Sequence, residues 1–501
     1  MAAGRWVRQV GSVCLFAVLA SAGCGGGGDG DEAEPTTRPN MVVFLVDDMD
    51  AMTMPLWDAL PQTKAALGDR GTTFTNAFAP DPLCCPARST LLTGKYAHNT
   101  GVLADGVFGD GYAAFASGAE ADTVATRLHG AGYRTAFIGK YLNGYDKDPS
   151  AVPPGWDEWF GLGGGFLDGY GYAANHNGAI ESFGSEPTDY LTDVLARTSL
   201  SFLEEAESDD DQPFLLFVSP TAPHANIPPA PRHTVNPFTD DELPLRPSFN
   251  EADVSDKPEW LREGVPLLDG VEDRQTDYRR MMGSMLAVDD LVGGVVEQLR
   301  QAGELDSTVL VFLSDNGLLF GAHRLVQKMA PYEESIRVPF VMAGPGIGSG
   351  TDPTMVAHTD LVPTLLDLAG VPVPDSIDGR SLRPVLDGTA SEWRDDLLIE
   401  HNGTYNPYAT YHTLADVRAY IASGSTPLVP TYRGVRTETH LYVQWYAGDQ
   451  HDYELYDLRA DPGQLDNLLA TADGRAANEV LVAELQARLD QLVACAGAAC
   501  R

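Results

Sequence analysis

The chain has few basic residues for its length of 501 residues. It contains 33 lysines and arginines against 71 aspartates and glutamates, which gives a formal net charge of −38. Proteins that bind nucleic acids need a basic face for the phosphate backbone, so this balance argues against that class. The same charge weakens the long-range attraction of a polyanion. An anionic substrate would therefore have to be captured by a local group of cations.

Long apolar runs are scarce as well. The run over residues 13–20 follows Arg5 and Arg8 and is too short to cross a bilayer, so residues 1–23 are predicted to be a signal peptide. Residues 24–39 follow as a flexible linker of glycines and acidic residues. The signal peptide predicts an exported protein, and no other uncharged stretch is long enough for a membrane span.

Cysteine is also rare, with six residues in the whole chain. Cys495 and Cys500 are spaced to close a small disulfide loop, which suits an exported protein. Cys84 and Cys85 are direct neighbours, and a disulfide between neighbours is strained. This central pair therefore needs another explanation.

Apolar runs typical of buried strands alternate with helical stretches. This alternation predicts an α/β fold with a doubly wound, mostly parallel sheet. We expect this domain to cover residues 40–392, and a smaller C-terminal α+β subdomain to cover residues 393–501. The predicted strands of the main sheet are residues 41–46, 134–139, 213–218 and 308–313, with helices at 122–131 and 274–302. The predicted elements of the subdomain are strands at 433–436, 440–443 and 453–457 and a helix at 475–493.

Polar residues follow several of the predicted strands at the point where each strand ends. In open α/β sheets this edge is where ligands bind. A helix cap or a turn explains any one such residue, but six of them at one edge indicate a site. They are Asp47, Asp48, Lys140, His224, Asp315 and Asn316.

The segment from Leu83 to Lys95 contains the cysteine pair. Pro86 suits the first turn of a helix, which would place Cys84 at the helix N-terminus. Free backbone N–H groups at that position favour an anion or a thiolate. The residues alone therefore predict an activated cysteine that faces an anion site, and a redox cysteine or an inert buried cysteine is the alternative.

The same segment resembles the signature of the type I sulfatase family. The matching residues are Cys84-Cys85-Pro86-Ala87-Arg88 followed by Thr93-Gly94, with Ala87 where the family most often has serine. The resemblance implies an alkaline-phosphatase-like fold. It also implies that a maturation enzyme oxidises Cys84, not Cys85, to formylglycine, whose hydrate is the nucleophile. Later family landmarks at residues 359–366, 378–382 and 455–462 extend the resemblance over nearly the whole chain.

A cation site follows from the ligand types and from the family. Asp47, Asp48, Asp315 and Asn316 offer only oxygen atoms, which suits Ca²⁺ or Mg²⁺. The family implies Ca²⁺, bound also by the oxygen of the modified Cys84. This ion would polarise the sulfuryl oxygens and favour the ionised nucleophile.

The remaining catalytic roles are implied by the family. Arg88 lies one helical turn after Cys84 and would hold the hydrate and balance the carboxylates. Lys140 and Lys328 match the two lysines that bind the sulfate, although Lys328 outside this context would be an ordinary surface lysine. His224 matches the histidine that faces the leaving-group oxygen and could donate a proton to it.

Several departures and matches point to one branch of the family. Leu142 stands where many arylsulfatases have histidine, and residues 94–99 and 152–156 are similar to N-acetylglucosamine-6-sulfatases and heparan endosulfatases. Against this branch, residues 318–319 are both leucine where the branch usually has Tyr-His. His98 is then a candidate contact for substrate. The alternative is a helix-end histidine satisfied by backbone carbonyls.

The N-terminal segment carries a further resemblance. Residues 19–24 resemble a bacterial lipoprotein signal, in which Cys24 would be acylated and would tether the protein to the cell envelope. Ser21 is a poor match to that signal, and plain secretion is the alternative.

Together these features predict an enzyme that hydrolyses sulfate esters. The expected substrates are sulfated carbohydrates such as N-acetylglucosamine 6-sulfate in glycosaminoglycans. Formylglycine enzymes of the same superfamily also hydrolyse phosphonate or phosphate esters, and fold alone does not decide between them. A catalytically inactive protein that binds sulfated glycans is the third hypothesis.

Overall fold

The computed structural model describes residues 38–52, 57, 60–105, 111–207, 212–233, 237–403, 429–447 and 450–501. The predicted signal peptide, Cys24 and most of the predicted linker lie outside these residues. Within them, no helix has both the length and the apolar character that a membrane span requires.

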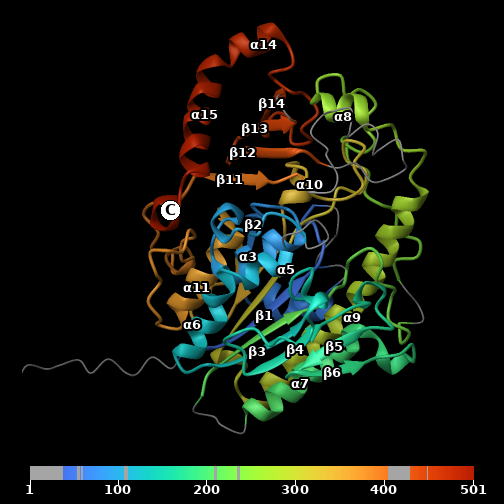
Figure 1. Ribbon diagram of the computed structural model, residues 1–501, viewed down its shortest axis with the longest axis vertical. Coiled ribbons are helices and arrows are strands. Elements are labelled where there is room, and N and C mark those ends of the chain that lie inside the picture. The colour runs from blue at the N-terminus through green and yellow to red at the C-terminus, as the bar shows by residue number, and fades with distance from the viewer. Residues whose placement is uncertain are drawn as a thin grey trace, which may run out of the picture. The chain divides into compact units, whose positions relative to one another are not determined.

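The main sheet has ten strands in the order β10-β2-β9-β8-β1-β7-β3-β4-β5-β6 (Figure 1). Its central strands β8, β1, β7 and β3 are parallel neighbours, which confirms the predicted α/β fold with a mostly parallel sheet. Strand β9 and the β5–β6 hairpin pair antiparallel to their neighbours. The strands are β1 (Asn40–Val46), β2 (Thr72–Phe78), β3 (Arg134–Gly139), β4 (Glu158–Leu162), β5 (Ala173–His176), β6 (Ala179–Ser182), β7 (Phe214–Ser219), β8 (Thr308–Ser314), β9 (Phe340–Ala343) and β10 (Gly350–Ala357).

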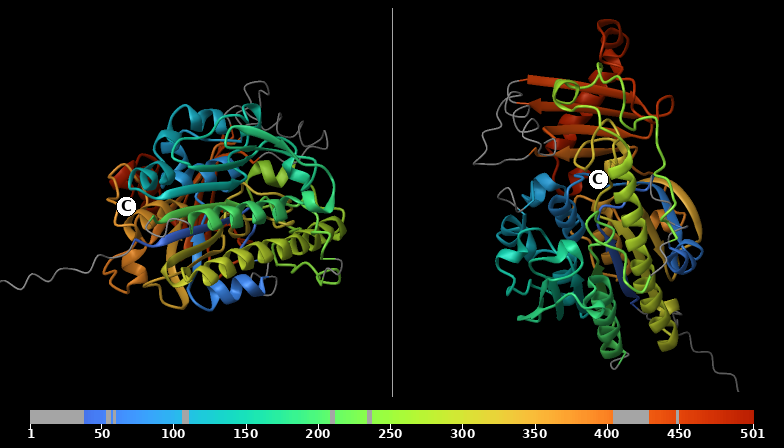
Figure 2. Two further views of the ribbon diagram at one scale, coloured as in Figure 1. Left: turned by 90° about the horizontal axis from the view of Figure 1, so that it is seen from below. Right: turned by 90° about the vertical axis from the view of Figure 1, so that its right-hand side faces the viewer.

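Successive residues of the central strands point into two different cores. On β1, Val42 and Phe44 face helices α7 (Leu191–Ala206) and α9 (Glu272–Ala302), which lie side by side on one face of the sheet (Figure 2). Met41 and Val43 belong to the core on the opposite face. Both faces are therefore covered, which explains why these strands are apolar without alternation. The helices of the second face are α3 (Cys84–Thr93), α6 (Val124–Gly130) and α11 (Leu361–Leu368).

The predicted helices form close to their expected limits. Helix α6 begins after Thr123, whose side chain accepts a hydrogen bond from the backbone N–H of Thr126. Helix α9 ends at Gly303, which adopts the left-handed conformation with φ +81°. The shorter helices are α2 (Pro61–Thr63), α4 (Ala97–Thr100), α5 (Gly111–Ala116), α8 (Glu259–Gly264), α10 (Glu333–Ile336), α12 (Arg383–Leu386) and α14 (Ala472–Ala477).

A second, antiparallel sheet of four strands follows near the C-terminus. Helix α15 (Glu479–Val493) packs its leucines against one face of this sheet, which confirms the predicted α+β subdomain. Cys495 and Cys500 form the predicted disulfide. The limit at residues 392 and 393 stays a prediction. The strands are β11 (Asp396–His401), β12 (Thr431–Thr437), β13 (His440–Ala447) and β14 (Gln450–Asp457).

The four parallel central strands bring their C-terminal ends to one edge of the sheet. Gly139 ends β3 with φ +129°, and a Cβ atom there would lie 2.1 Å from the carbonyl oxygen of Ser219 on β7. Only glycine suits such a conformation and such a close approach. Lys140 follows at once, and its backbone N–H donates to the Ser219 carbonyl at the end of β7 at 2.8 Å.

Candidate functional site

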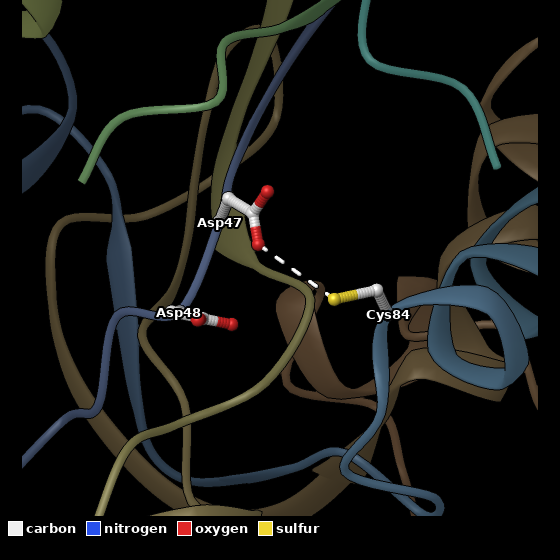
Figure 3. A group of neighbouring side chains, drawn as sticks. All are labelled: Asp47, Asp48 and Cys84. Carbon is white, nitrogen blue, oxygen red and sulfur yellow. Dashed lines mark hydrogen bonds between the residues drawn. The ribbon is translucent and has the colours of Figure 1, made fainter. Parts of the chain in front are cut away.

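Cys84 opens helix α3 and faces the end of strand β1 (Figure 3). Its Sγ lies 3.9 Å from Asp47 Oδ1 and 2.8 Å from Lys328 Nζ. Pro86 lies in the first turn of α3, as the sequence predicts. The helix start thus carries Cys84 to the edge where the parallel strands end.

Arg88 links the ends of the central strands. Its Nε donates to Asp315 Oδ2 at 2.8 Å, and its Nη1 donates to the Lys140 carbonyl and to Ser219 Oγ, each at 2.7 Å. Its Nη2 lies 3.6 Å from Asp47 Oδ2. The guanidinium is buried and balances two carboxylates, which agrees with part of the role that the family implies.

Two lysines pair with the carboxylates that follow β1. Lys140 Nζ donates to Asp47, and Lys328 Nζ donates to Asp48. Burial would raise the pKa of Asp47, but Lys140 and Arg88 lower it well below its usual range. Burial would lower the pKa of Lys328, but Asp48 and Cys84 raise it. Asp47 and Lys328 are therefore ionised, and the two lysine–carboxylate pairs hold one another in place.

The pKa of Asp315 is shifted in the opposite direction from that of Asp47, although both carboxylates contact Arg88. Burial and the charge of Asp47 raise the pKa of Asp315 to about 6, and Arg88 offsets only part of this. Asp315 Oδ1 also accepts the backbone N–H of Asp48 at 3.1 Å. The three carboxylates Asp47, Asp48 and Asp315 face the three cations Arg88, Lys140 and Lys328, so their formal charges cancel.

His224 lies beside Asp48. Its Nε2 is 3.6 Å from Asp48 Oδ2, whereas its Nδ1 is buried without a hydrogen-bond partner among the described residues. Burial lowers the pKa of His224, and Asp48 offsets only part of this shift. The histidine is thus placed beside the carboxylates and is neutral near pH 7.

The thiol of Cys84 is not the activated thiolate that its helix-end position alone predicts. Burial raises the pKa of Cys84, and the charges of Lys140 and Lys328 lower it only in part. Desolvation disfavours the charged form of a thiol, and here it outweighs the favourable position at the helix start. An unmodified Cys84 is therefore protonated and weakly nucleophilic.

The donor set fits a hard divalent cation. One ligand atom each from Asp47, Asp48 and Cys84 lies within 4.8 Å of the others. Asn316 Nδ2 donates to Asp48 Oδ1 at 2.7 Å, while its buried Oδ1 has no hydrogen-bond partner among the described residues. Carboxylate and amide oxygens of this kind are ligands for Ca²⁺ and Mg²⁺.

A cavity of about 530 Å³ opens above Cys84 and is in the size range of small-molecule sites. Cys84, Lys140, His224 and Lys328 lie at its base. Residues that the sequence analysis missed also line this cavity, and among them only Phe166, Leu167 and Asp168 follow a glycine-rich loop, at residues 163–165. The missed residues are Asp105, Asn143, Asp146, Phe166, Leu167, Asp168, Gln327 and Met329.

His98 lies elsewhere. Its Nδ1 contacts Glu400 Oε1 at 2.9 Å, and its Nε2 contacts the carbonyl oxygen of Cys495 at 3.1 Å. Both ring nitrogens are therefore engaged, and His98 is not among the residues that line the cavity above Cys84. The Cys495 contact agrees with the alternative of a helix-end histidine satisfied by backbone carbonyls, whereas the second partner is a carboxylate and not a carbonyl.

A second cavity of about 670 Å³ is lined by residues of β13, β14 and α15 and by residues 255–258 and 262, which come long before the C-terminal sheet in the chain. Tyr442, Tyr453 and Arg475 are among its lining residues, and it contains none of the strand-end residues named above. It is larger, but Cys84 and the two lysines beside it do not line it. We therefore place the chemistry in the cavity above Cys84.

A comparison with protein families finds two matching models. The model described as "Sulfatase" matches residues 39–371. The model described as "N-sulphoglucosamine sulphohydrolase, C-terminal" matches residues 321–494. The first match covers the main sheet and all the residues that follow its strand ends. The second match covers the C-terminal sheet.

Known proteins are similar over nearly the full length. An N-acetylglucosamine-6-sulfatase from Capra hircus is 34% identical, covering 94% of this chain and 86% of the relative. Among solved structures, one described as a complex with its substrate D-glucosamine-2-N,6-O-disulfate has a TM-score of 0.73 at 24% identity, covering 90% of this chain and 97% of that one. A phosphonate monoester hydrolase from Agrobacterium radiobacter has a TM-score of 0.68 at 23% identity, covering 91% and 96%. At such identities the solved structures show the shared fold and do not separate the two chemistries.

Proposed function

This chain belongs to the sulfatase family and is a sulfuric ester hydrolase, and from this premise we propose that it acts on sulfated carbohydrates such as N-acetylglucosamine 6-sulfate. The observation that carries the proposal is the position of Cys84. It lies at the base of the cavity, with Lys328 Nζ 2.8 Å from its Sγ and Lys140 beside it. A nucleophile between two cations suits the transfer of an anionic group.

We propose that Cys84 acts after oxidation to formylglycine by a maturation enzyme. The raised pKa of the Cys84 thiol supports this modification, because the thiol itself is a poor nucleophile here. One hydroxyl of the aldehyde hydrate would attack sulfur, and the bond from sulfur to the sugar oxygen would break. The second hydroxyl would then lose its proton, and the aldehyde would re-form as sulfate leaves.

The surrounding residues would bind the sulfate and move the protons. Lys140 and Lys328 would hold the sulfate oxygens, and Arg88 would keep the carboxylates in place. His224 would pass a proton to the sugar oxygen; the negative charge of the bound sulfate favours its protonated form. Asp47, Asp48, Asp315 and Asn316 would hold Ca²⁺, with Mg²⁺ as the alternative, and the ion would polarise the sulfuryl oxygens.

The walls of the cavity support a carbohydrate substrate. Asp105, Asp146 and Asp168 can accept hydrogen bonds from sugar hydroxyl groups, and the half-buried Phe166 offers an apolar face to a sugar ring. Cations at the base and carboxylates on the walls suit a molecule with one anionic group and several hydroxyl groups. The similarity to N-acetylglucosamine-6-sulfatases points to the same class.

A direct comparison of esters tests this function. The sulfate and phosphate monoesters of 4-nitrophenol share one leaving group, and N-acetylglucosamine 6-sulfate is assayed beside them. We expect kcat/KM to be at least ~100-fold higher for the sulfate than for the phosphate, which is about 2.7 kcal/mol of discrimination, and we expect the sugar sulfate to be hydrolysed. A preference for phosphate or phosphonate would reject the proposal. No turnover by fully oxidised protein would instead support a glycan-binding protein.

We further propose that the protein is exported and tethered through an acylated Cys24. The disulfide between Cys495 and Cys500 supports export, since such bonds persist in oxidising compartments. In the native host, labelled palmitate should enter the wild-type protein and the Cys14→Ala control but not Cys24→Ala. Unlabelled wild-type protein in the medium would indicate plain secretion.

A further inference from the structure

The loop that carries Lys328 turns sharply just after this residue. Met329 has φ +82°, a left-handed conformation that is unfavourable for a residue with a side chain. Its backbone N–H donates to the Pro82 carbonyl at 3.2 Å, and its carbonyl accepts the Tyr432 hydroxyl at 2.8 Å. Contacts on both sides therefore hold an unfavourable turn beside the lysine that contacts Cys84.

Tyr432 provides the second of these contacts from the C-terminal sheet. It lies on β12, 103 positions away from Met329 in the sequence, and is fully buried. Its ring packs against Trp445, with ring centroids 5.0 Å apart, and against His401, with centroids 5.8 Å apart. The position of the hydroxyl is thus determined by the packing of the sheet and not by the loop.

The same sheet also holds the residues that lead into Cys84. At the end of β11, the backbone N–H of Glu400 donates to the Pro80 carbonyl at 2.8 Å. The ring of His401 contacts Asp81 Oδ1 at 3.2 Å through its Nδ1, and both residues are buried. Pro82 in turn accepts the Met329 N–H. The C-terminal sheet therefore contacts both the segment before Cys84 and the turn after Lys328.

We propose that Tyr432 is a positioning residue whose hydroxyl holds the turn at Met329 and thereby aims Lys328 at residue 84. Tyr432 does not line the cavity above Cys84, so it acts through the lysine and not on the substrate. The inference rests on the proposed role of Lys328 in binding the sulfate. It gives the C-terminal sheet a part in catalysis.

The substitution Tyr432→Phe removes only the hydroxyl oxygen and tests this inference. We expect kcat/KM for the sulfate ester to fall roughly 10-fold to 100-fold, because small misplacements of a positioned group have effects of this size. The formylglycine content of each preparation is measured and used to normalise the rates. Tyr442→Phe is the matched control, since Tyr442 is also buried in the C-terminal sheet and its hydroxyl contacts Gln486 at 2.9 Å, away from the cavity above Cys84. We expect the control to keep the wild-type rate.

A double-mutant cycle separates positioning from a general loss of stability. If Tyr432 acts through Lys328, adding Tyr432→Phe to Lys328→Ala should lower kcat/KM by less than about twofold. An equal loss in both backgrounds would overturn the proposal, as would an unchanged rate in Tyr432→Phe alone. A Tyr432→Phe protein too unstable to purify would overturn it too, because the hydroxyl would then support the fold and not the turn.

The cycle also distinguishes this inference from the proposed function. If Lys328→Ala alone keeps the wild-type rate, the proposed role of Lys328 is wrong, and the positioning role of Tyr432 falls with it. If Lys328→Ala is impaired while Tyr432→Phe is not, only the inference about Tyr432 fails.

Discussion

Replacing Cys84 with alanine should lower kcat by at least ~10⁴-fold, because the variant lacks the atom that attacks sulfur. The neighbouring cysteine provides the matched control. Cys85 is buried in the same helix turn, but its Sγ accepts the backbone N–H of Asn143 at 3.0 Å, and Cys85 is not among the residues that line the cavity above Cys84. We expect Cys85→Ala to lower kcat less than about tenfold.

Two measurements are needed for this prediction. Steady-state kinetics compare the variants, and peptide mass spectrometry with an aldehyde-trapping reagent follows residue 84 in the tryptic peptide of residues 71–88. Formylglycine at position 84 in active wild-type protein would agree with the mechanism. Full activity of Cys84→Ala, or an unmodified thiol in active protein, would exclude residue 84 as the proposed nucleophile.

Removal of divalent cations should have the second largest effect. Chelation is expected to abolish sulfate ester hydrolysis, and Ca²⁺ is expected to restore it more fully than Mg²⁺. The substitution Asp48→Asn keeps the shape of the side chain but removes a charge that faces Lys328 and the other proposed ligands. We expect it to lower kcat/KM at least ~100-fold, since a bound metal supplies several kcal/mol of charge stabilisation in such reactions.

Thermal unfolding gives a readout of this site that does not depend on activity. A ligand present at 100 times its Kd stabilises the folded state by about 2.7 kcal/mol, so Ca²⁺ should raise the Tm of the wild-type protein by a few degrees. Asp48→Asn should lose most of this shift. The control Asp306→Asn changes an exposed aspartate just before β8, away from the site. This control should show the same Ca²⁺-dependent rise in Tm as the wild-type protein. Full activity in protein shown to be metal-free by elemental analysis would contradict the prediction.

Much of the fold and the site could be predicted from the sequence because it depends on local physical chemistry. Buried runs such as residues 308–313 show the strands, and Pro86 shows where α3 begins. Polar residues such as Asp47 and Asp315 directly follow apolar strands, so a parallel sheet necessarily gathers them at one edge. The spacing of Cys495 and Cys500 likewise predicted their disulfide.

The tertiary structure alone decided the pKa values of the site residues and the long-range contacts that hold their side chains and loops in place. The helix N-terminus suggests a thiolate at Cys84, but burial by distant segments raises its pKa. His98 closely follows helix α3 in the sequence, yet its two ring nitrogens contact Glu400 and the Cys495 carbonyl.

The contact of Tyr432 with Met329 spans 103 positions of the chain. A local sequence pattern encodes periodicity, caps and strand ends. It does not encode which distant groups remove water from a side chain or hold its loop, because those effects exist only once the two sheets have packed together.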